Sequence, residues 1–173
     1  MKVVIGSDHR GFEAKQKVRA ILTELGHEYI DVGTNDNNPV DYPDLAYRAA
    51  TAVANNEADR AILACATGIG MCITANKVKG IMAAICHDEL NARISRDHNN
   101  ANVLCISGDQ IDEVVLRKIV EVWLTTEFSG GRHQRRVNKI IAIEEGRMPQ
   151  DVANNNNVPY SSQTSSAEAD TAK

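Results

Sequence analysis

Short apolar runs alternate with amphipathic stretches along the first 150 residues, and this alternation constrains the fold more than any other feature. The stretches between the runs carry apolar residues at helical spacing, as Ala14, Val18, Ile21 and Leu22 do. Strands spaced roughly 20 to 30 residues apart with helices between them form βαβ units. The sequence therefore predicts an α/β class fold, a doubly wound sandwich in which helices cover both faces of a parallel sheet of five strands.

The ends of the predicted elements follow from local signals. Gly26 ends the first helix, Pro43 begins the second, and Asp109 together with Asp112 is expected to cap the fifth. The predicted strands cover residues 2–6, 28–32, 61–65, 81–86 and 103–107. The predicted helices cover about 14–25, 43–53, 71–78, 87–97 and 110–126.

An extra C-terminal helix, from Arg132 to Glu145, is expected beyond the sheet. Its apolar residues Val137, Ile140 and Ile141 need a surface to pack against. A second copy of the chain could provide that surface across a twofold axis.

The composition divides the 173 residues into one domain and a tail. Hydrophobic residues make up 43% of the chain, which is enough for a single core over residues 1–150. From Asp151 onward the sequence is rich in Asn, Ser and Thr and has few apolar side chains. Because such a segment cannot offset its ordering entropy, we predict that residues 151–173 form a disordered polar tail without a catalytic part.

Charge and cysteine usage restrict the partners and the compartment. The 19 basic and 23 acidic residues give a net charge of −4, which argues against binding to nucleic acid or to an anionic membrane. The sequence has no apolar run near the ~20 residues of a membrane span, and residues 1–6 do not look like a signal peptide. Four cysteines without a CxxC pair favour reduced thiols. These features predict a cytoplasmic protein.

Two segments that carry polar or thiol side chains directly follow predicted strands. In doubly wound sheets, ligands bind outside the carboxyl ends of the strands, so these segments are candidates for a binding site. In residues 6–11 (GSDHRG), Asp8 and His9 stand where a helix begins and would face the ligand crevice. A capping aspartate beside a surface histidine explains them equally well.

The second segment is residues 65–71 (CATGIGM), whose small residues let backbone amides approach an anion near a helix N-terminus. It is neither a P-loop nor a dinucleotide fingerprint. A helix N-terminus favours an anion by roughly 0.3–1 kcal/mol, so the thiolate of Cys65 could serve as a general base. An inert, packed cysteine is the alternative, and it is the better interpretation for Cys72, Cys86 and Cys105.

Two further segments carry imidazole and guanidinium groups. Residues 96–102 (RDHNNAN), expected at the same edge of the sheet, place His98 in a polar loop where it could titrate near neutrality or simply fill the loop. In residues 130–136 (GGRHQRR), Arg132 and Arg136 share one helical face and could close on one phosphate. A solvated run of charge is the ordinary alternative for this cluster.

These four segments, in this order, resemble type B ribose-5-phosphate isomerase over residues 1–148. The resemblance implies a Rossmann-like fold and an enzyme that interconverts ribose 5-phosphate and ribulose 5-phosphate, in the non-oxidative branch of the pentose phosphate pathway. It also implies a metal-independent reaction with no cofactor. The partners would be a small sugar phosphate and further copies of the chain, in a homodimer or homotetramer with active sites shared between subunits.

The same resemblance implies roles for individual residues. Cys65 would carry the proton between two sugar carbons, and His98 of a neighbouring subunit would help to open the sugar ring. The residues whose amides would stabilise the enediolate are Ala66, Thr67, Gly68, Ile69 and Gly70. The residues that would bind sugar hydroxyls are Asp8 and Asn99, and those that would bind the phosphate are His9, Arg132 and Arg136.

Two positions depart from the pattern, and several alternatives stay open. Ala66 stands where many relatives have glycine, which still allows amide donation. Asp109 stands where many have an arginine near the phosphate, which implies fewer phosphate contacts or a shifted substrate range. Tyr42 matches a tyrosine that lines the site. An isomerase of a six-carbon sugar phosphate, such as allose 6-phosphate, and a non-catalytic sensor of sugar phosphates fit the same residues. A metal-dependent enzyme is disfavoured because the His, Asp and Glu residues lack familiar ligand spacing.

Overall fold

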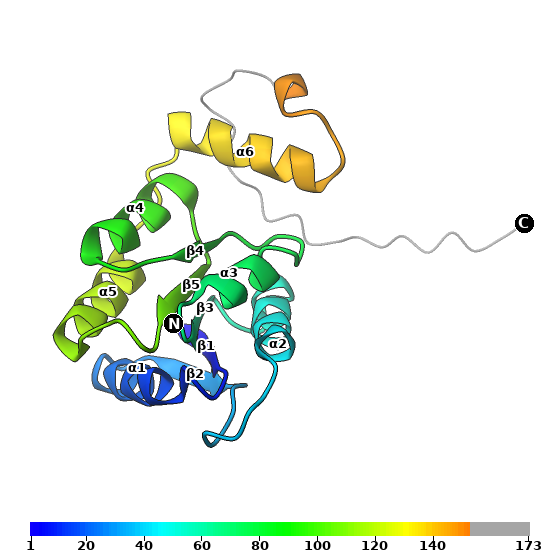
Figure 1. Cartoon of the computed structure of the whole chain (residues 1–173). Helices are drawn as coiled ribbons and strands as arrows, with labels where there is room; N and C mark the ends of the chain where they lie inside the picture. The colour runs from blue at the N-terminus through cyan, green and yellow to red at the C-terminus, as the bar shows by residue number, and fades with distance from the viewer. Residues whose placement is uncertain (153–173) are drawn as a thin grey trace, which may run out of the picture.

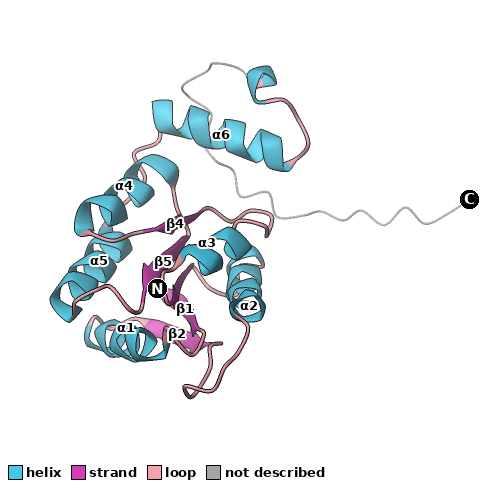
Figure 2. Cartoon of the chain, in the orientation of Figure 1, coloured by secondary structure: helices cyan, strands magenta, loops and turns pink. Residues whose placement is uncertain are grey.

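The computed structural model describes residues 1–152, in which strands and helices alternate regularly (Figure 2). A short 3₁₀ turn, Pro149–Asp151, follows the last helix. The strands are β1 (Lys2–Ser7), β2 (Glu28–Asp31), β3 (Arg60–Cys65), β4 (Ala83–Ile85) and β5 (Val103–Ser107). The α-helices are α1 (Phe12–Glu24), α2 (Tyr42–Ala54), α3 (Ile69–Ala75), α4 (Glu89–Asn99), α5 (Glu113–Thr125) and α6 (Arg132–Glu144).

The five strands form one sheet in the order β2-β1-β3-β5-β4, and every neighbouring pair is parallel. This confirms the predicted α/β class with a five-stranded parallel sheet. The central strand β3 pairs with β1 through Ala64 and Ser7, and with β5 through Cys65 and Ser107. The carboxyl ends of β1, β3 and β5 therefore lie side by side.

Alternate residues of each strand face opposite layers of helices, as the two-residue period of a strand requires. Val3, Ile62 and Leu104 pack in a core with residues of α1, α4 and α5. Val4, Leu63 and Val103 pack in a second core with residues of α2 and α3. Figure 1 shows helices on both sides of the sheet, which is the predicted three-layer arrangement.

Several element boundaries differ from the sequence prediction by a few residues, and two of them bear on the site. Helix α3 begins at Ile69 instead of 71, directly after Gly68, whose φ of +79° sets the turn into the helix. Helix α5 begins at Glu113 instead of 110, because the carboxylate of Asp112 alone caps it by accepting a bond from the Val114 amide at 2.8 Å. The prediction that Asp109 shares this cap was wrong. Asp109 is instead bonded to Arg10.

Helix α6 lies apart from the sheet, as predicted, and packs against α4 (Figure 1). Val137 and Ala142 are buried, whereas Ile140 and Ile143 are exposed. The prediction of a disordered tail over 151–173 falls almost entirely outside the described residues. Of that segment, the structure describes only Asp151 and Val152.

Candidate active site

The carboxyl ends of β1, β3 and β5 meet by direct backbone packing. A Cβ atom on Gly11 would lie 2.2 Å from the carbonyl oxygen of Ala64, and one on Gly108 would lie 2.6 Å from that of Arg10. The Gly108 amide also donates to the Cys65 carbonyl at 2.7 Å. These close approaches require glycine and hold the turns after the three strands in fixed positions.

Asp8 and His9 lie in the turn between β1 and α1. The Asp8 side chain is buried, and its Oδ1 accepts bonds from the amides of Arg10 and Gly11, each at 2.9 Å. It thus stabilises its own turn, while Gly11 occupies the capping position of α1. The His9 Nδ1 atom accepts a bond from the Val40 amide at 3.3 Å, which directs that imidazole toward the segment before α2.

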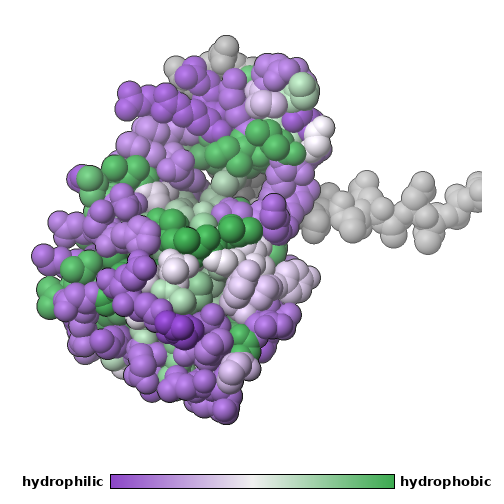
Figure 3. Space-filling view, viewed as in Figure 1, coloured by the Kyte–Doolittle hydropathy of each residue, from purple (hydrophilic) through white to green (hydrophobic). Residues whose placement is uncertain are grey.

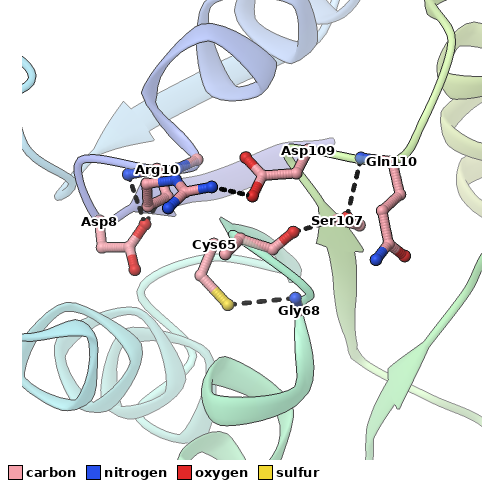
Figure 4. Close-up of polar contacts among 9 residues, drawn as sticks. Asp8, Arg10, Cys65, Gly68, Ser107, Asp109 and Gln110 are labelled. Carbon is pink, nitrogen blue, oxygen red and sulfur yellow. Dashed lines mark hydrogen bonds and ion pairs between the residues drawn. The ribbon is translucent and has the colours of Figure 1, made fainter.

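Cys65 ends β3 and is buried, with 5% of the residue exposed. The Gly68 amide donates to the Cys65 Sγ atom at 3.1 Å (Figure 4). The sulfur therefore accepts a hydrogen bond from the amide-rich loop that follows it.

The loop after Cys65 leads into α3 under the ring of Tyr42. The Thr67 Oγ1 atom accepts a bond from the Ile69 amide at 3.3 Å. A Cβ atom on Gly70 would lie 2.6 Å from the Tyr42 ring, so Gly70 is required for this contact. Tyr42 is partly exposed at the start of α2 and borders the loop, as the sequence comparison implied.

Two residues to which the sequence analysis gave no role also lie at this edge (Figure 4). Arg10 forms an ion pair with Asp109 through its Nη2 atom. The Ser107 hydroxyl donates to the Ala66 carbonyl at 2.6 Å and accepts from the Gln110 amide at 3.1 Å. The signal that could have found both is their position, since each stands at or just after the carboxyl end of a strand.

His98 and Asn99 are not at this edge, and that prediction was wrong. They form the last turn of α4 and not a loop. Helix α4 precedes β5 and runs against it, so its end lies at the amino end of the sheet. Strand β5 has 5 residues, and at ~3.3 Å per residue it separates the two edges by roughly 16 Å.

The amino edge gathers imidazoles and guanidiniums from α4 and α6. The rings of His98 and His133 stack with centroids 4.0 Å apart and an angle of 7° between their planes. The Arg132 Nε atom donates to the His133 Nε2 atom at 3.3 Å. Desolvation lowers the pKa of His133, and the charges of His98, Arg132 and Arg136 lower it further. These residues thus form one group at the amino edge. The sequence carried no separate signal for His133, although this residue lies in the segment of residues 130–136.

The predicted site residues therefore divide into two sets on one chain. The set at the carboxyl edge consists of Asp8, His9, Cys65, Ala66, Thr67, Gly68, Ile69 and Gly70. The set at the amino edge consists of His98, Asn99, Arg132 and Arg136. A single chain does not bring the two sets onto one small ligand.

A cavity of about 220 Å³ lies near the amino edge and not at Cys65. Its lining includes the buried guanidiniums of Arg60 and Arg96, and Val137 of α6. Arg60 donates to the carbonyls of Trp123 and Leu124, so it caps the C-terminal end of α5.

Within residues 1–152, His, Cys, Asp and Glu form no group of three or more that could hold a metal ion. In the same part of the chain, no helix is long and apolar enough to cross a membrane.

Comparison with known proteins identifies the family. Residues 3–140 match the profile described as Ribose/Galactose Isomerase, and the chain belongs to this family. It is 44% identical over 146 residues to ribose-5-phosphate isomerase B of Escherichia coli, covering 84% of this chain and 98% of that protein.

Solved structures agree with the sequence match. Ribose-5-phosphate isomerase B of Clostridium thermocellum superposes with a TM-score of 0.83 at 46% identity, covering 84% of this chain and 99% of that one. The type B ribose 5-phosphate isomerase of Trypanosoma brucei gives 0.80 at 44% identity, covering 82% and 97%. The fold described above is thus the fold of this family.

Proposed function

We propose that this protein is an aldose–ketose isomerase that interconverts ribose 5-phosphate and ribulose 5-phosphate in the non-oxidative branch of the pentose phosphate pathway. The observation that carries the proposal is the Cys65 thiol, buried at the carboxyl end of β3 and bonded to the Gly68 amide, in a member of the ribose/galactose isomerase family. Relatives of similar length named ribose-5-phosphate isomerase B support the substrate.

The chemistry needs a base and a set of donors for an oxyanion. Isomerisation removes a proton from the carbon beside a carbonyl, and negative charge then develops on the carbonyl oxygen. We assign the proton transfer to the thiolate of Cys65 and the stabilisation of the enediolate to the amides of residues 66–70. Asp8, whose described contacts use only Oδ1, is assigned to a sugar hydroxyl. His9 is assigned to the phosphate.

The remaining groups would come from a second copy of the chain. Within one chain, the amino edge of the sheet lies a strand's length from Cys65. This edge carries His98, Asn99, Arg132 and Arg136. In a dimer with twofold symmetry, the partner would place its own amino edge against Cys65. Figure 3 shows apolar side chains exposed on this face in two bands. The exposed apolar residues of helices α3 and α6 are Ile69 and Ile73 of α3 and Ile140 and Ile143 of α6. An apolar surface of this kind supports at least a homodimer, with a tetramer as the other possible assembly.

A six-carbon sugar phosphate is the second candidate substrate. It is favoured by the match to a family described by both ribose and galactose, and by Asp109 at the site. The test is a direct assay of ribose 5-phosphate and allose 6-phosphate side by side, following formation of the ketose. We expect faster conversion of ribose 5-phosphate. A protein that binds either compound without converting it would instead be a sensor, and the isomerase proposal would be wrong.

We also propose that the reaction needs no metal or cofactor, because a thiolate and backbone amides can supply both the base and the oxyanion donors. Full activity after treatment with a chelator is the expected result.

The four cysteines are free thiols, which fits the cytosolic location that the sequence predicts.

A further inference from the structure

The ion pair between Arg10 and Asp109 crosses the carboxyl edge of the sheet at the end of β3. Arg10 follows β1 and Asp109 follows β5, and these two strands flank β3 on either side. Figure 4 shows the guanidinium and the carboxylate facing each other at the sheet edge, with the Cys65 sulfur directed away from them toward Gly68. The Asp109 amide is bonded to the Ala66 carbonyl, so the ion pair borders the loop that follows Cys65.

The backbone fixes the positions of both partners. The Arg10 amide donates to Asp8 Oδ1 at 2.9 Å, and the Asp109 amide donates to the Ala66 carbonyl at 3.3 Å. The neighbouring residues Gly11 and Gly108 pack against backbone atoms with no room for a Cβ. The two Cα atoms therefore cannot separate easily. The side chains, however, can change partners without movement of the turns.

The pair leaves most of the guanidinium available. The described contact uses one nitrogen, Nη2 of Arg10, and one oxygen, Oδ2 of Asp109. The Arg10 side chain is 59% exposed and that of Asp109 is 37% exposed. An ion pair this exposed to water contributes little to stability, so exchanging it costs little. A guanidinium can hold a phosphate through two parallel bonds, and a phosphate dianion carries more charge than a carboxylate.

We propose that Arg10 binds the phosphate group of the substrate and that Asp109 is the partner it leaves to do so. This assignment rests on the proposed function and adds a cation from the chain that carries Cys65 to those assigned to the neighbouring chain. In the free enzyme Asp109 holds the guanidinium at the sheet edge. In the complex the carboxylate stands beside a phosphate of like charge and lowers its affinity. Arg10 and Asp109 therefore have opposite effects on phosphate binding.

The opposite signs give the test. We would measure binding of inorganic phosphate by calorimetry to the full-length protein and to Arg10→Ala, Arg10→Lys, Asp109→Asn and the double variant Arg10→Ala/Asp109→Asn. We expect Arg10→Ala to weaken binding about tenfold, which corresponds to the loss of ~1.4 kcal/mol, and Arg10→Lys to restore part of it. Asp109→Asn should tighten binding several-fold. The double variant should gain less over Arg10→Ala than Asp109→Asn gains over the wild type, because only the relief of repulsion by Asp109 remains once Arg10 is absent.

The matched control is Arg117→Ala. Arg117 is 41% exposed and pairs with Glu24 and Glu121 between α1 and α5, away from the site. It should leave phosphate binding unchanged. In turnover assays, Arg10→Ala should raise KM for the sugar phosphate with little change in kcat. Melting temperatures of all variants show whether any effect comes from loss of folding.

If the ion pair is only a structural tie, Arg10→Ala and Asp109→Asn will change phosphate binding in the same direction or leave it unchanged, and either result overturns the proposal. The proposal for Arg10 can be tested separately from the proposed function. Phosphate binding does not depend on turnover, so opposite effects in a protein that fails to convert ribose 5-phosphate would sustain the role of Arg10 and refute the isomerase.

Discussion

The two edges of the sheet differ in how they hold chemical groups. At the carboxyl edge, three turns packed backbone to backbone around Gly11 and Gly108 present a buried thiol and loop amides. At the amino edge, the ends of α4 and α6 present side chains, with the His98 and His133 rings stacked beside Arg132. The first edge suits bond-making at a reacting carbon, and the second suits the binding of a charged group. Because a strand separates them, the proposed site combines groups from two chains.

Replacing the thiol tests the carboxyl edge and has the largest expected effect. Cys65→Ala should lower kcat by about 10²–10⁴, the usual contribution of a general acid–base group. Folding and binding of the sugar phosphate should change little, because the alanine still fits the buried position. Near wild-type turnover in steady-state assays would show that Cys65 is a packing residue and that the base is elsewhere.

Mixing variants tests whether the two edges of different chains combine. Cys65→Ala disables one edge and Arg132→Ala weakens the other, so a hybrid dimer has one intact site. After subunit exchange at equal amounts, random pairing gives about one quarter of the wild-type activity at low substrate concentration. Exchange is verified with a tagged chain. No gain after verified exchange would mean that each site is built within one chain.

Removing single cations tests the amino edge. Arg132→Ala and Arg136→Ala should each raise KM by about 10- to 100-fold, since a charge-assisted hydrogen bond contributes ~1.5–3 kcal/mol. A small effect on kcat is expected, because neither group touches the reacting carbons. The control is Arg135→Ala, which removes a charge from the neighbouring position of α6. An equal rise in KM for the control would show that the effect comes from the overall charge of the helix and not from specific contacts of Arg132 and Arg136.

Truncation after Val152 should have the smallest effect. The sequence of residues 153–173 has few apolar side chains, so we expect no change in melting temperature, turnover or assembly. Scattering and activity assays of the full and shortened chains check this. A shortened chain that loses its oligomeric state would show that the segment stabilises the contact between chains.

The sequence was sufficient for the order of elements and for the placement of Cys65 and its loop at the carboxyl end of β3. Those depend on local patterns, such as the alternation of strands and helices and the small residues that follow Cys65. Prediction was poorer at helix ends, where Asp109 and Asp112 both looked like caps and only Asp112 is one. Choosing between two acceptors depends on what else each can reach, and Asp109 reaches Arg10, 99 residues away in sequence.

The periodicity and turn residues of this chain determine by themselves a parallel α/β sheet in which Asp8 and His9 follow β1 and Cys65 ends β3. The tertiary structure alone decides which groups are neighbours. It moves His98 and Asn99 to the opposite edge from Cys65, since α4 returns along the sheet before β5 begins. It also places Arg10 against Asp109 and His98 against His133. The physical reason is that these contacts depend on the path of the chain through space, which residue spacing does not encode.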